Sequence, residues 1–544
     1  MDPPSKPASK KCLEGPKLQT IETYGGLGVR YLDHLYQNLN KIHQIDTVTG
    51  VTETNGSVRS RAIQIAIEMR NQGIVENDII LVCSRCHADQ TIVVLASFLI
   101  GAIVAPLDPN LHHKECIGLV KQLKPKICFC DLRTLKQIER VIMETGLNSK
   151  MVHFGDQQQY AISFRKLLMS KQHSDHFDPI NIEQPRKRIA FILPTQGVTG
   201  PPKLVCLSHH FIYTQTLIFH QVMSSPEKLL SFYSLSWIMQ VILMCLCFEV
   251  QIVRVLTGTF QERTTCKTIQ DLKIDHVFLN TDLAIQLVEH VAVRDFNLSC
   301  LRCVFIGSLS TTFHDINKLV ERLPKVRFTQ LYCTTEVGAA VACSPIDYLE
   351  SLDKTGAVGK VVQNYKLRVV DINSRTDVEP ECCGELLVAG DCMMLGYFKN
   401  LQCTKASMQQ GYFKTGDIAR YDPSGWIYVE GRVVDLINIK GTKVSPREIE
   451  DIIMTHPFVK DTAVISNDKE IVACVIVKGE TKITETKLLT FISERVPVQK
   501  WPTRIIFMND FPTTPLGKIK RDVLREEVLT VKIEYSESDE TMPI

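Results

Sequence analysis

The hydrophobic and polar positions in the first third of the chain follow two different periods. Residues 59–72 and 134–145 repeat apolar side chains at helical spacing, whereas residues 78–83 and 126–130 form short, nearly continuous apolar runs. Runs of this length indicate buried strands, and helices between them act as the crossovers of a parallel sheet. The pattern predicts an α/β layer over residues 18–188.

The pattern changes to strands and turns between residues 356 and 431. Strand-like runs at residues 366–371, 385–389 and 426–430 are separated by turns that contain glycine. Short strands separated by turn residues favour antiparallel pairing. We expect a small, largely antiparallel β-barrel that completes a large N-terminal α/β domain.

Beyond residue 432 the chain has the pattern of a second, smaller domain. Ser445-Pro446-Arg447-Glu448 is typical of a helix start, because serine caps the first turn, proline fits its first position and glutamate completes a capping box. The expected elements are helices at 445–455 and 485–495 and strands near 461–466, 471–477 and 504–508. The sequence therefore predicts two domains, residues 1–432 and an α+β domain of residues 433–544.

Composition narrows the class of protein. The chain of 544 residues is several times longer than a typical domain with a single hydrophobic core, so we expect more than one domain. Its 62 Lys and Arg and 60 Asp and Glu give a formal charge of +2, which argues against binding to nucleic acid. The 19 cysteines are scattered, many of them inside apolar runs, so we expect reduced thiols in an intracellular protein. Two Cys-x-x-Cys pairs, Cys83 with Cys86 and Cys300 with Cys303, lie far apart in the chain beside strand-like runs, which favours core cysteines over a zinc site.

Two long apolar stretches raise the question of a membrane span. Residues 91–107 carry no charge, and residues 237–248 are almost entirely apolar. Both are shorter than the ~20 residues that a transmembrane helix needs. We expect no transmembrane segment, and buried core elements in their place.

Residues 411–450 hold the densest run of polar and charged residues with a chemical use. Thr415-Gly416-Asp417 precedes a hairpin whose turn is Tyr421-Asp422-Pro423-Ser424-Gly425. Gly431-Arg432 and Lys440-Gly441 then follow on either side of the predicted domain boundary. A carboxylate, an arginine and a lysine thus flank a predicted hinge.

A second stretch, residues 189–205, places a strand before a glycine-rich loop that contains Lys203. Backbone N–H groups in such a loop can close on phosphate oxygens, and the ammonium group adds positive charge. A loop of this kind alone is weak support for a phosphate site, since many surface loops contain glycine and lysine.

These stretches and others resemble, in the same order along nearly the whole chain, the motifs of the adenylate-forming superfamily of acyl-CoA synthetases, coumarate:CoA ligases and beetle luciferases. The matching stretches are residues 101–109, 195–205, 330–336, 356–359, 394–398, 411–450 and 515–518. The resemblance implies a mobile C-terminal lid, ATP, Mg²⁺ and coenzyme A as cofactors, and a small carboxylic acid, fatty or otherwise apolar, as substrate.

The resemblance also implies residue roles in the first half-reaction. Asp417 would accept the ribose hydroxyls with Arg432 assisting, and Tyr332 would stack on the adenine. Glu336 would hold magnesium, and Thr335 would bind a phosphate oxygen. Lys518 would neutralise the charge that develops between the carboxylate and the α-phosphate. In the second half-reaction the lid would rotate, so that Lys440 lies near the adenylate and Gly441 leaves room for the pantetheine arm.

The phosphate loop and its surroundings match this superfamily only in part. Thr195, Gly197, Thr199, Gly200 and Lys203 fit the pattern. Gln196 and Val198 replace hydroxyl residues, and Leu204 replaces a glycine, so the loop is expected to bind phosphate less well. Cys333 stands for a glycine and Val434 for a polar hinge residue. The corresponding acyl and adenine pockets would include Trp237, Gly307 and Ser308.

We therefore expect an acyl-CoA synthetase with an atypical phosphate loop and reduced activity. Two alternatives stay open: a luciferase-like monooxygenase, and a catalytically impaired protein that only binds acyl groups or nucleotides. The last residues are not the Ser-Lys-Leu signal of many relatives, so a cytoplasmic protein is favoured over a peroxisomal one.

Overall fold

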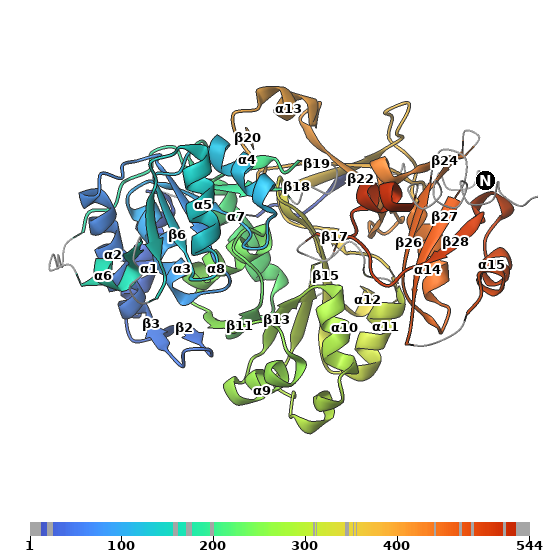
Figure 1. Ribbon diagram of the computed structural model, residues 1–544, viewed down its shortest axis with the longest axis horizontal. Coiled ribbons are helices and arrows are strands. Elements are labelled where there is room, and N and C mark those ends of the chain that lie inside the picture. The colour runs from blue at the N-terminus through green and yellow to red at the C-terminus, as the bar shows by residue number, and fades with distance from the viewer. Residues whose placement is uncertain are drawn as a thin grey trace, which may run out of the picture.

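The structure is a computed structural model with a large lobe and a smaller C-terminal lobe (Figure 1). It describes residues 12–18, 25–155, 161–169, 177–195, 201–307, 311, 313–342, 348–351, 353–354, 356–439, 442–466, 471–479, 483–514 and 518–528. No described helix has the length and apolar composition needed to cross a lipid bilayer.

An eight-stranded sheet forms the first layer, in the order β20-β10-β9-β5-β4-β6-β7-β8. Its strands from β9 to β8 pair in parallel, as the sequence predicts. Helices connect β4 to β5, β5 to β6, β6 to β7 and β8 to β9, as parallel pairing requires. The strands are β4 (Ile79–Cys83), β5 (Ile103–Pro106), β6 (Ile127–Cys130), β7 (Lys150–His153), β8 (Ile162–Ser163), β9 (Ile189–Pro194), β10 (Leu204–Ser208) and β20 (Gly396–Tyr397). The connecting helices are α3 (Ala88–Leu99), α4 (His113–Leu123), α5 (Leu135–Thr145) and α6 (Phe164–Leu168).

A nine-stranded sheet forms the second layer, in the order β17-β16-β15-β14-β13-β11-β12-β2-β3. Its strands are β2 (Ile42–Asp46), β3 (Thr52–Thr54), β11 (Lys228–Ser231), β12 (Val253–Leu256), β13 (His276–Leu279), β14 (Cys303–Ile306), β15 (Arg327–Thr334), β16 (Gly338–Ala342) and β17 (Lys360–Val361). The helices are α1 (Gly26–Gln37), α2 (Asn55–Asn71), α7 (His209–Val222), α8 (Ile238–Val250), α9 (Glu262–Leu272), α10 (Thr281–Glu289) and α11 (Phe313–Arg322), with the short 3₁₀ helix η1 (Val291–Asp295).

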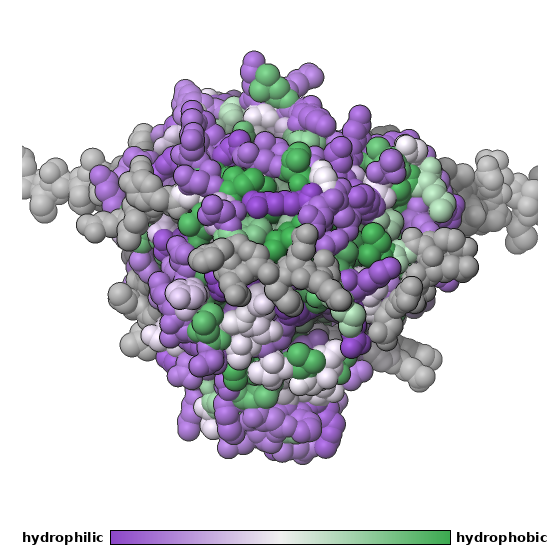
Figure 2. All heavy atoms as spheres, turned by 90° about the vertical axis from the view of Figure 1, so that its left-hand side faces the viewer, coloured by the Kyte–Doolittle hydropathy of each residue, from purple (hydrophilic) through white to green (hydrophobic). Residues whose placement is uncertain are grey.

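The two apolar stretches that raised the membrane question are core elements: residues 91–107 form most of α3 and all of β5, and residues 237–248 form most of α8. Both α3 and α8 are buried along nearly their whole length and belong to the largest hydrophobic cluster. A helix that is apolar on all sides is expected where other elements cover every face. The face of the large lobe at the left of Figure 1 is mostly hydrophilic, with apolar residues in small separate groups (Figure 2).

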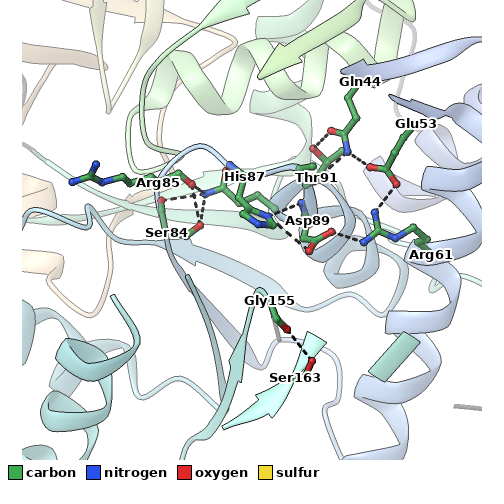
Figure 3. Close-up of polar contacts among 12 residues, drawn as sticks. Gln44, Glu53, Arg61, Ser84, Arg85, His87, Asp89, Thr91, Gly155 and Ser163 are labelled. Carbon is green, nitrogen blue, oxygen red and sulfur yellow. Dashed lines mark hydrogen bonds and ion pairs between the residues drawn. The ribbon is translucent and has the colours of Figure 1, made fainter. Parts of the chain in front are cut away.

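A polar network joins helix α3 of the first layer to helix α2 and the edge strands β2 and β3 of the second (Figure 3). The Arg61 guanidinium pairs with both Glu53 and Asp89. Gln44 on β2 accepts a 2.8 Å hydrogen bond from Thr91 on α3 and donates one to Glu53. These groups satisfy one another, so the network fixes the two layers without a ligand.

The region expected to be a barrel is an open antiparallel sheet in the described residues. Its order is β1-β18-β19-β22-β21, and β23 also pairs with β22. One edge of β22 pairs with β19, whereas its other edge pairs first with β21 and then with β23, so the sheet branches at β22 instead of closing. The elements are β1 (Leu13–Glu14), α12 (Tyr348–Ser351), β18 (Tyr365–Val370), β19 (Gly384–Gly390), α13 (Leu401–Ala406), β21 (Met408–Gln409), β22 (Tyr412–Tyr421) and β23 (Ile427–Arg432).

The C-terminal lobe has its own hydrophobic core, at the right of Figure 1. Helices α14 and α15 cover a three-stranded sheet in the order β26-β27-β28. The helix predicted at Ser445 starts at Pro446, the position that suits proline. The predicted serine cap does not form, because the Ser445 hydroxyl donates to the Glu430 carbonyl and makes no cap hydrogen bond. The elements are η2 (Val433–Asp435), β24 (Ile437–Ile439), β25 (Thr442–Val444), α14 (Pro446–Met454), β26 (Val459–Ser466), β27 (Ile471–Val477), α15 (Glu485–Ser493), η3 (Val498–Lys500) and β28 (Arg504–Phe507).

Candidate active site

A cleft of about 660 Å³ lies where the three sheets of the large lobe meet the C-terminal lobe. This volume is typical of small-molecule sites. Its lining brings together eight of the predicted site residues from five stretches of the chain: Thr195, Lys203, Trp237, Thr335, Glu336, Asp417, Arg432 and Lys518.

One end of the cleft is built around Asp417. The register of β22 and β23 places Asp417 directly opposite Arg432, and the Arg432 Nε lies 3.1 Å from the Asp417 Oδ1. The Tyr332 hydroxyl, from β15, donates a 2.6 Å hydrogen bond to the other carboxylate oxygen. The Asp417 Oδ1 is buried and accepts no hydrogen bond from any described residue. A buried acceptor of this kind fits a ligand hydroxyl, since leaving it unpaired costs free energy.

Tyr332 has a different visible role from the one that the resemblance implies. Its side chain is 1% exposed and does not line the cleft. The described contact is the hydrogen bond that orients Asp417. Stacking of adenine on this ring stays a prediction.

The charges around Asp417 influence one another. Burial raises the pKa of the Asp417 carboxyl, and the positive charges of Arg432 and Lys518 offset part of that rise. Burial also lowers the pKa of the Lys518 ammonium, which the carboxylates of Asp417 and Glu336 raise again. Each group therefore stabilises the charged form of the other.

Lys518 reaches this cleft from a tight turn of the C-terminal lobe. Thr514 closes the turn twice: its backbone N–H donates to the Lys518 carbonyl at 2.7 Å, and its hydroxyl accepts from the Lys518 N–H at 3.1 Å. The intervening residues 515–517 lie outside the described residues. Lys518, the last residue of the Pro-Leu-Gly-Lys pattern, lines the cleft.

Glu336 and Thr335 occupy the turn between β15 and β16. The Tyr397 hydroxyl donates a 2.9 Å hydrogen bond to the Glu336 Oε1, and the Glu336 carbonyl accepts one from the Met394 N–H at 2.8 Å. Burial raises the pKa of the Glu336 carboxyl, while the bond from Tyr397 and the charge of Lys203 lower it. Carboxylate oxygens are the ligands that Mg²⁺ prefers.

Thr195 and Lys203 form the two sides of the predicted phosphate loop. The Thr195 N–H donates to the Lys203 carbonyl at 2.7 Å, and the Lys203 N–H donates to the Thr195 hydroxyl at 2.9 Å. The Lys203 side chain is exposed and its ammonium lies 5.1 Å from the centre of the Tyr397 ring. The loop residues Gln196, Gly197, Val198, Thr199 and Gly200 lie outside the described residues.

The structure corrects the interpretation of Leu204 as a loop residue. Leu204 begins β10, pairs with Pro194 on β9 and is only 2% exposed. Its side chain packs in the hydrophobic core beside α4 and α5. The loop has ended by this position, so a glycine here would remove core contacts without adding useful flexibility.

Trp237 bounds the cleft on a different side. Its ring packs edge-on against Tyr233 and Phe278, with ring centres 4.7 and 5.2 Å apart. Gly307 lies behind it, where an added Cβ would approach the Trp237 ring to 3.0 Å. Ser308, and the hinge-side pair Lys440 and Gly441, lie outside the described residues.

Two residues of the cleft were not assigned a role from the sequence. Cys333 lies at a bulge between β15 and β16, and its thiol has a pKa raised by burial. Tyr397 lines the cleft and contacts Glu336. The only sequence signal for Tyr397 was its position in the Met-Leu-Gly-Tyr-Phe stretch.

Comparisons with known proteins give the cleft a context. The model of the AMP-binding enzyme family matches residues 34–398, and that of the AMP-binding enzyme C-terminal domain matches residues 448–518. A luciferin 4-monooxygenase of Photuris pensylvanica is 26% identical over 486 residues, covering 85% of this chain and 87% of its own. The 4-coumarate--CoA ligase-like 9 of Arabidopsis thaliana is 24% identical over 509 residues, covering 91% and 87%. The crystal structure of ATP-bound MatB from Rhodopseudomonas palustris is 20% identical, with a TM-score of 0.84 over 93% of this chain and 99% of that one.

Proposed function

Because this chain belongs to the family of AMP-binding enzymes, we propose that it activates a carboxylic acid with ATP and transfers the acyl group to coenzyme A. The observation that carries the proposal is the cleft itself. Asp417, Glu336, Lys203 and Lys518 come from four separate stretches of the chain and line one cavity. Together they supply the charges that both a nucleotide and a carboxylate require.

The first step forms an acyl-adenylate. A carboxylate oxygen of the substrate attacks the α-phosphorus of ATP, and the bond to pyrophosphate breaks with the electron pair leaving on pyrophosphate. The Lys518 ammonium neutralises the negative charge shared by the carboxylate and the α-phosphate, which otherwise repel. Its position beside Asp417 and Glu336 supports this role, since both carboxylates favour its charged form.

Asp417 and Arg432 would hold the nucleoside. The Asp417 Oδ1, which is ion-paired with Arg432 but accepts no hydrogen bond from a described residue, would accept hydrogen bonds from the ribose hydroxyls, and Tyr332 keeps the other oxygen occupied. Arg432 lies on the neighbouring strand and limits the rise of the Asp417 pKa that burial causes. Arg432 thereby favours the ionised form of the buried carboxylate.

Glu336 and Thr335 would face the phosphates together with Lys203 and Thr195. The Glu336 carboxylate is the group that fits Mg²⁺, which when bound neutralises phosphate charge. The Lys203 ammonium lies on the exposed side of the same region. With the hydroxyls at positions 196 and 198 replaced, these charged groups would have to hold the pyrophosphate with fewer neutral hydrogen bonds, which is our reason for proposing a slow enzyme.

The second step would need the C-terminal lobe, residues 433–544, to turn away from this arrangement. The coenzyme A thiol would attack the acyl carbonyl and release AMP, while Gly441 leaves a path for pantetheine and Lys440 lies near the adenylate. Two described contacts of the lobe would then break: Arg447 donating to the Thr311 carbonyl at 2.8 Å and Ser445 donating to the Glu430 carbonyl at 2.7 Å. The rotation would therefore have to break at least these two hydrogen bonds.

The proposal is tested with purified protein and a broad panel of carboxylic acids, with fatty and aromatic acids included. The expected result is ATP-dependent pyrophosphate release that requires one class of acid, followed by a thioester once coenzyme A is added. Binding of acid and nucleotide without pyrophosphate release would favour an impaired binding protein.

A light-emitting monooxygenase is the second candidate, because the relatives include luciferin 4-monooxygenases at 26% and 27% identity. Such an enzyme would share the adenylation step and then use oxygen in place of coenzyme A. Light emission from the protein with beetle luciferin, ATP and oxygen would support it, and thioester formation without light would exclude it.

A further inference from the structure

We propose that Tyr397 is a positioning residue that holds Glu336 and Lys203 in the arrangement required at the phosphate end of the cleft. The inference rests on the proposed function, because it concerns the same nucleotide site. It is carried by the geometry of one side chain that contacts both charged groups.

The backbone of Tyr397 belongs to β20, which pairs with β10, the strand that directly follows Lys203. β20 pairs antiparallel with β10, so that Tyr397 lies opposite Val205. The Phe398 N–H donates to the Leu204 carbonyl at 2.7 Å, and the Leu395 N–H donates to the Cys206 carbonyl at 2.9 Å. Tyr397 is thereby fixed in register against the end of the phosphate loop.

The chain after Tyr397 restricts its position further. The Tyr397 N–H donates to the Thr404 hydroxyl at 2.9 Å, and the Asn400 N–H donates to the Tyr397 carbonyl at 3.1 Å. Gly396 has φ +138°, and a Cβ there would approach the Thr404 side chain to 3.0 Å. Only glycine suits this close approach, so the turn that aims the phenol depends on it.

The phenol and the neighbouring backbone hold Glu336 from two directions. The hydroxyl donates to the Glu336 Oε1 at 2.9 Å, while Met394, three residues before Tyr397, donates its N–H to the Glu336 carbonyl at 2.8 Å. The tyrosine side chain is 7% exposed, so water competes little for this bond. The Tyr397 hydroxyl thus restrains one oxygen of the Glu336 carboxylate.

The face of the same ring provides a site for the Lys203 ammonium, which lies 5.1 Å from the ring centre. A cation at this distance from an aromatic face is attracted by the ring. Because Lys203 is exposed, this contact limits the positions of a flexible side chain before nucleotide binds. Tyr397 therefore links the anion-binding lysine to the carboxylate that fits magnesium.

The test separates the hydroxyl from the ring. Tyr397→Phe removes only the bond to Glu336, whereas Tyr397→Leu also removes the aromatic face for Lys203. Tyr421→Phe is the matched control, because this buried tyrosine donates to the Val378 carbonyl at 3.1 Å outside the cleft. Binding of a non-hydrolysable ATP analogue is measured by calorimetry over a range of Mg²⁺ concentrations, without acid or coenzyme A, and thermal melting checks folding.

We expect Tyr397→Phe to raise the Mg²⁺ concentration for half-maximal nucleotide binding about tenfold, the scale of one hydrogen bond to a charged group. Tyr397→Leu should have the larger effect, and Tyr421→Phe none. In a Glu336→Gln background, Tyr397→Phe should add less than twofold, because its target has lost the charge. Additive effects, or a wild-type Mg²⁺ dependence in Tyr397→Phe, would overturn the inference.

The outcome is separable from that of the proposed function. A protein that releases no pyrophosphate with any acid contradicts the proposed synthetase activity. The nucleotide-binding measurements on the Tyr397→Phe and Glu336→Gln single and double variants still test the role of Tyr397 in that case. A wild-type protein that binds the nucleotide without any Mg²⁺ dependence contradicts the role of Tyr397, even where pyrophosphate release is found.

Discussion

The two ends of the cleft are built in different ways. At the end proposed to bind the ribose, Asp417 is 2% exposed and is held between residues of two strands, β15 and β23, by a hydrogen bond and an ion pair. At the end proposed to bind the phosphates, Lys203 is exposed and Glu336 lies in a turn, held by Tyr397. Strand register positions the first set, whereas the second depends on loops and single side chains.

This difference indicates in which part of the cleft the side chains of this chain can differ from those of its relatives without abolishing adenylation. The charged groups are present at both ends, and the replaced hydroxyls at positions 196 and 198 fall only in the phosphate loop. Each neutral hydrogen bond lost there is worth about 1 kcal/mol, so adenylation would be slowed but retained. The comparison therefore predicts normal nucleoside binding together with slow chemistry.

The largest effect is expected from Lys518, which serves both ends. Lys518→Ala should lower acyl-adenylate formation ~10²-fold or more, because one charge-stabilising group is lost from the transition state. Thioester formation from a supplied acyl-adenylate should survive, as single-turnover assays of each half-reaction would show. Lys520→Ala, two positions along, is the control and should leave both steps unchanged.

Gly441→Leu should show the opposite separation. A leucine at this position would fill the path of the thiol, so thioester formation should fall while pyrophosphate release persists. Single-turnover assays of acyl-adenylate formation and of thioester formation measure the two effects. Equal loss of both steps in Gly441→Leu and Lys518→Ala would contradict a lid that serves two half-reactions.

Asp417→Asn should weaken the ribose end. Loss of a charged acceptor for the ribose hydroxyls should raise the Kd for ATP about tenfold or more, since such hydrogen bonds contribute ~1.5–3 kcal/mol. Calorimetry measures the change. Asp377→Asn is the control, because its pair with Arg368 lies outside the cleft. An unaltered ATP affinity in Asp417→Asn would remove this residue from the site.

Restoring the two hydroxyl side chains of the phosphate loop should change activity less than the preceding variants, and it should raise the adenylation rate where they lower activity or affinity. Gln196→Ser with Val198→Thr should raise the adenylation rate up to about tenfold by restoring hydroxyl donors. Leu204 is left unchanged, because it is a core residue of β10. The preferred acid should stay the same, as competition between two acids would show. A changed preference would mean that the loop contacts the acyl group.

The pH dependence should show the smallest change. Adenylation needs the Lys518 ammonium, and burial lowers its pKa below the ordinary value for lysine. The rate should therefore fall as the pH rises through that lowered pKa, and the limb should move to higher pH in Lys518→Arg, whose charge persists. A pH–rate profile of pyrophosphate release checks this, and an unmoved alkaline limb would assign the titration to another group.

Sequence patterns predicted the parallel layer, the helix at Pro446 and the grouping of Lys203, Glu336 and Asp417 with Lys518, because strong periodicity and colinear motifs encode them. They did not predict the branching at β22, which depends on which edge of a long strand each neighbour takes. They also placed Leu204 in the loop. The preceding Pro-Pro-Lys sequence gives no signal of where the loop ends and β10 begins, so the sequence alone did not show that Leu204 is a strand residue. The hydrogen bond from Tyr397 to Glu336 joins residues 61 positions apart and needs the fold to be seen.

The central claim is that a complete set of charged residues, combined with a phosphate loop that lacks two hydroxyl side chains, makes a slow enzyme. Pre-steady-state pyrophosphate release tests this claim most directly. The native chain, its Lys518→Ala variant and the variant with serine at 196 and threonine at 198 would be compared with the same acid panel. We predict slow release by the native chain that depends on one class of acid, faster release by the repaired loop and almost none without Lys518. No release by either the native or the repaired chain, while both fold and bind nucleotide, would contradict the account.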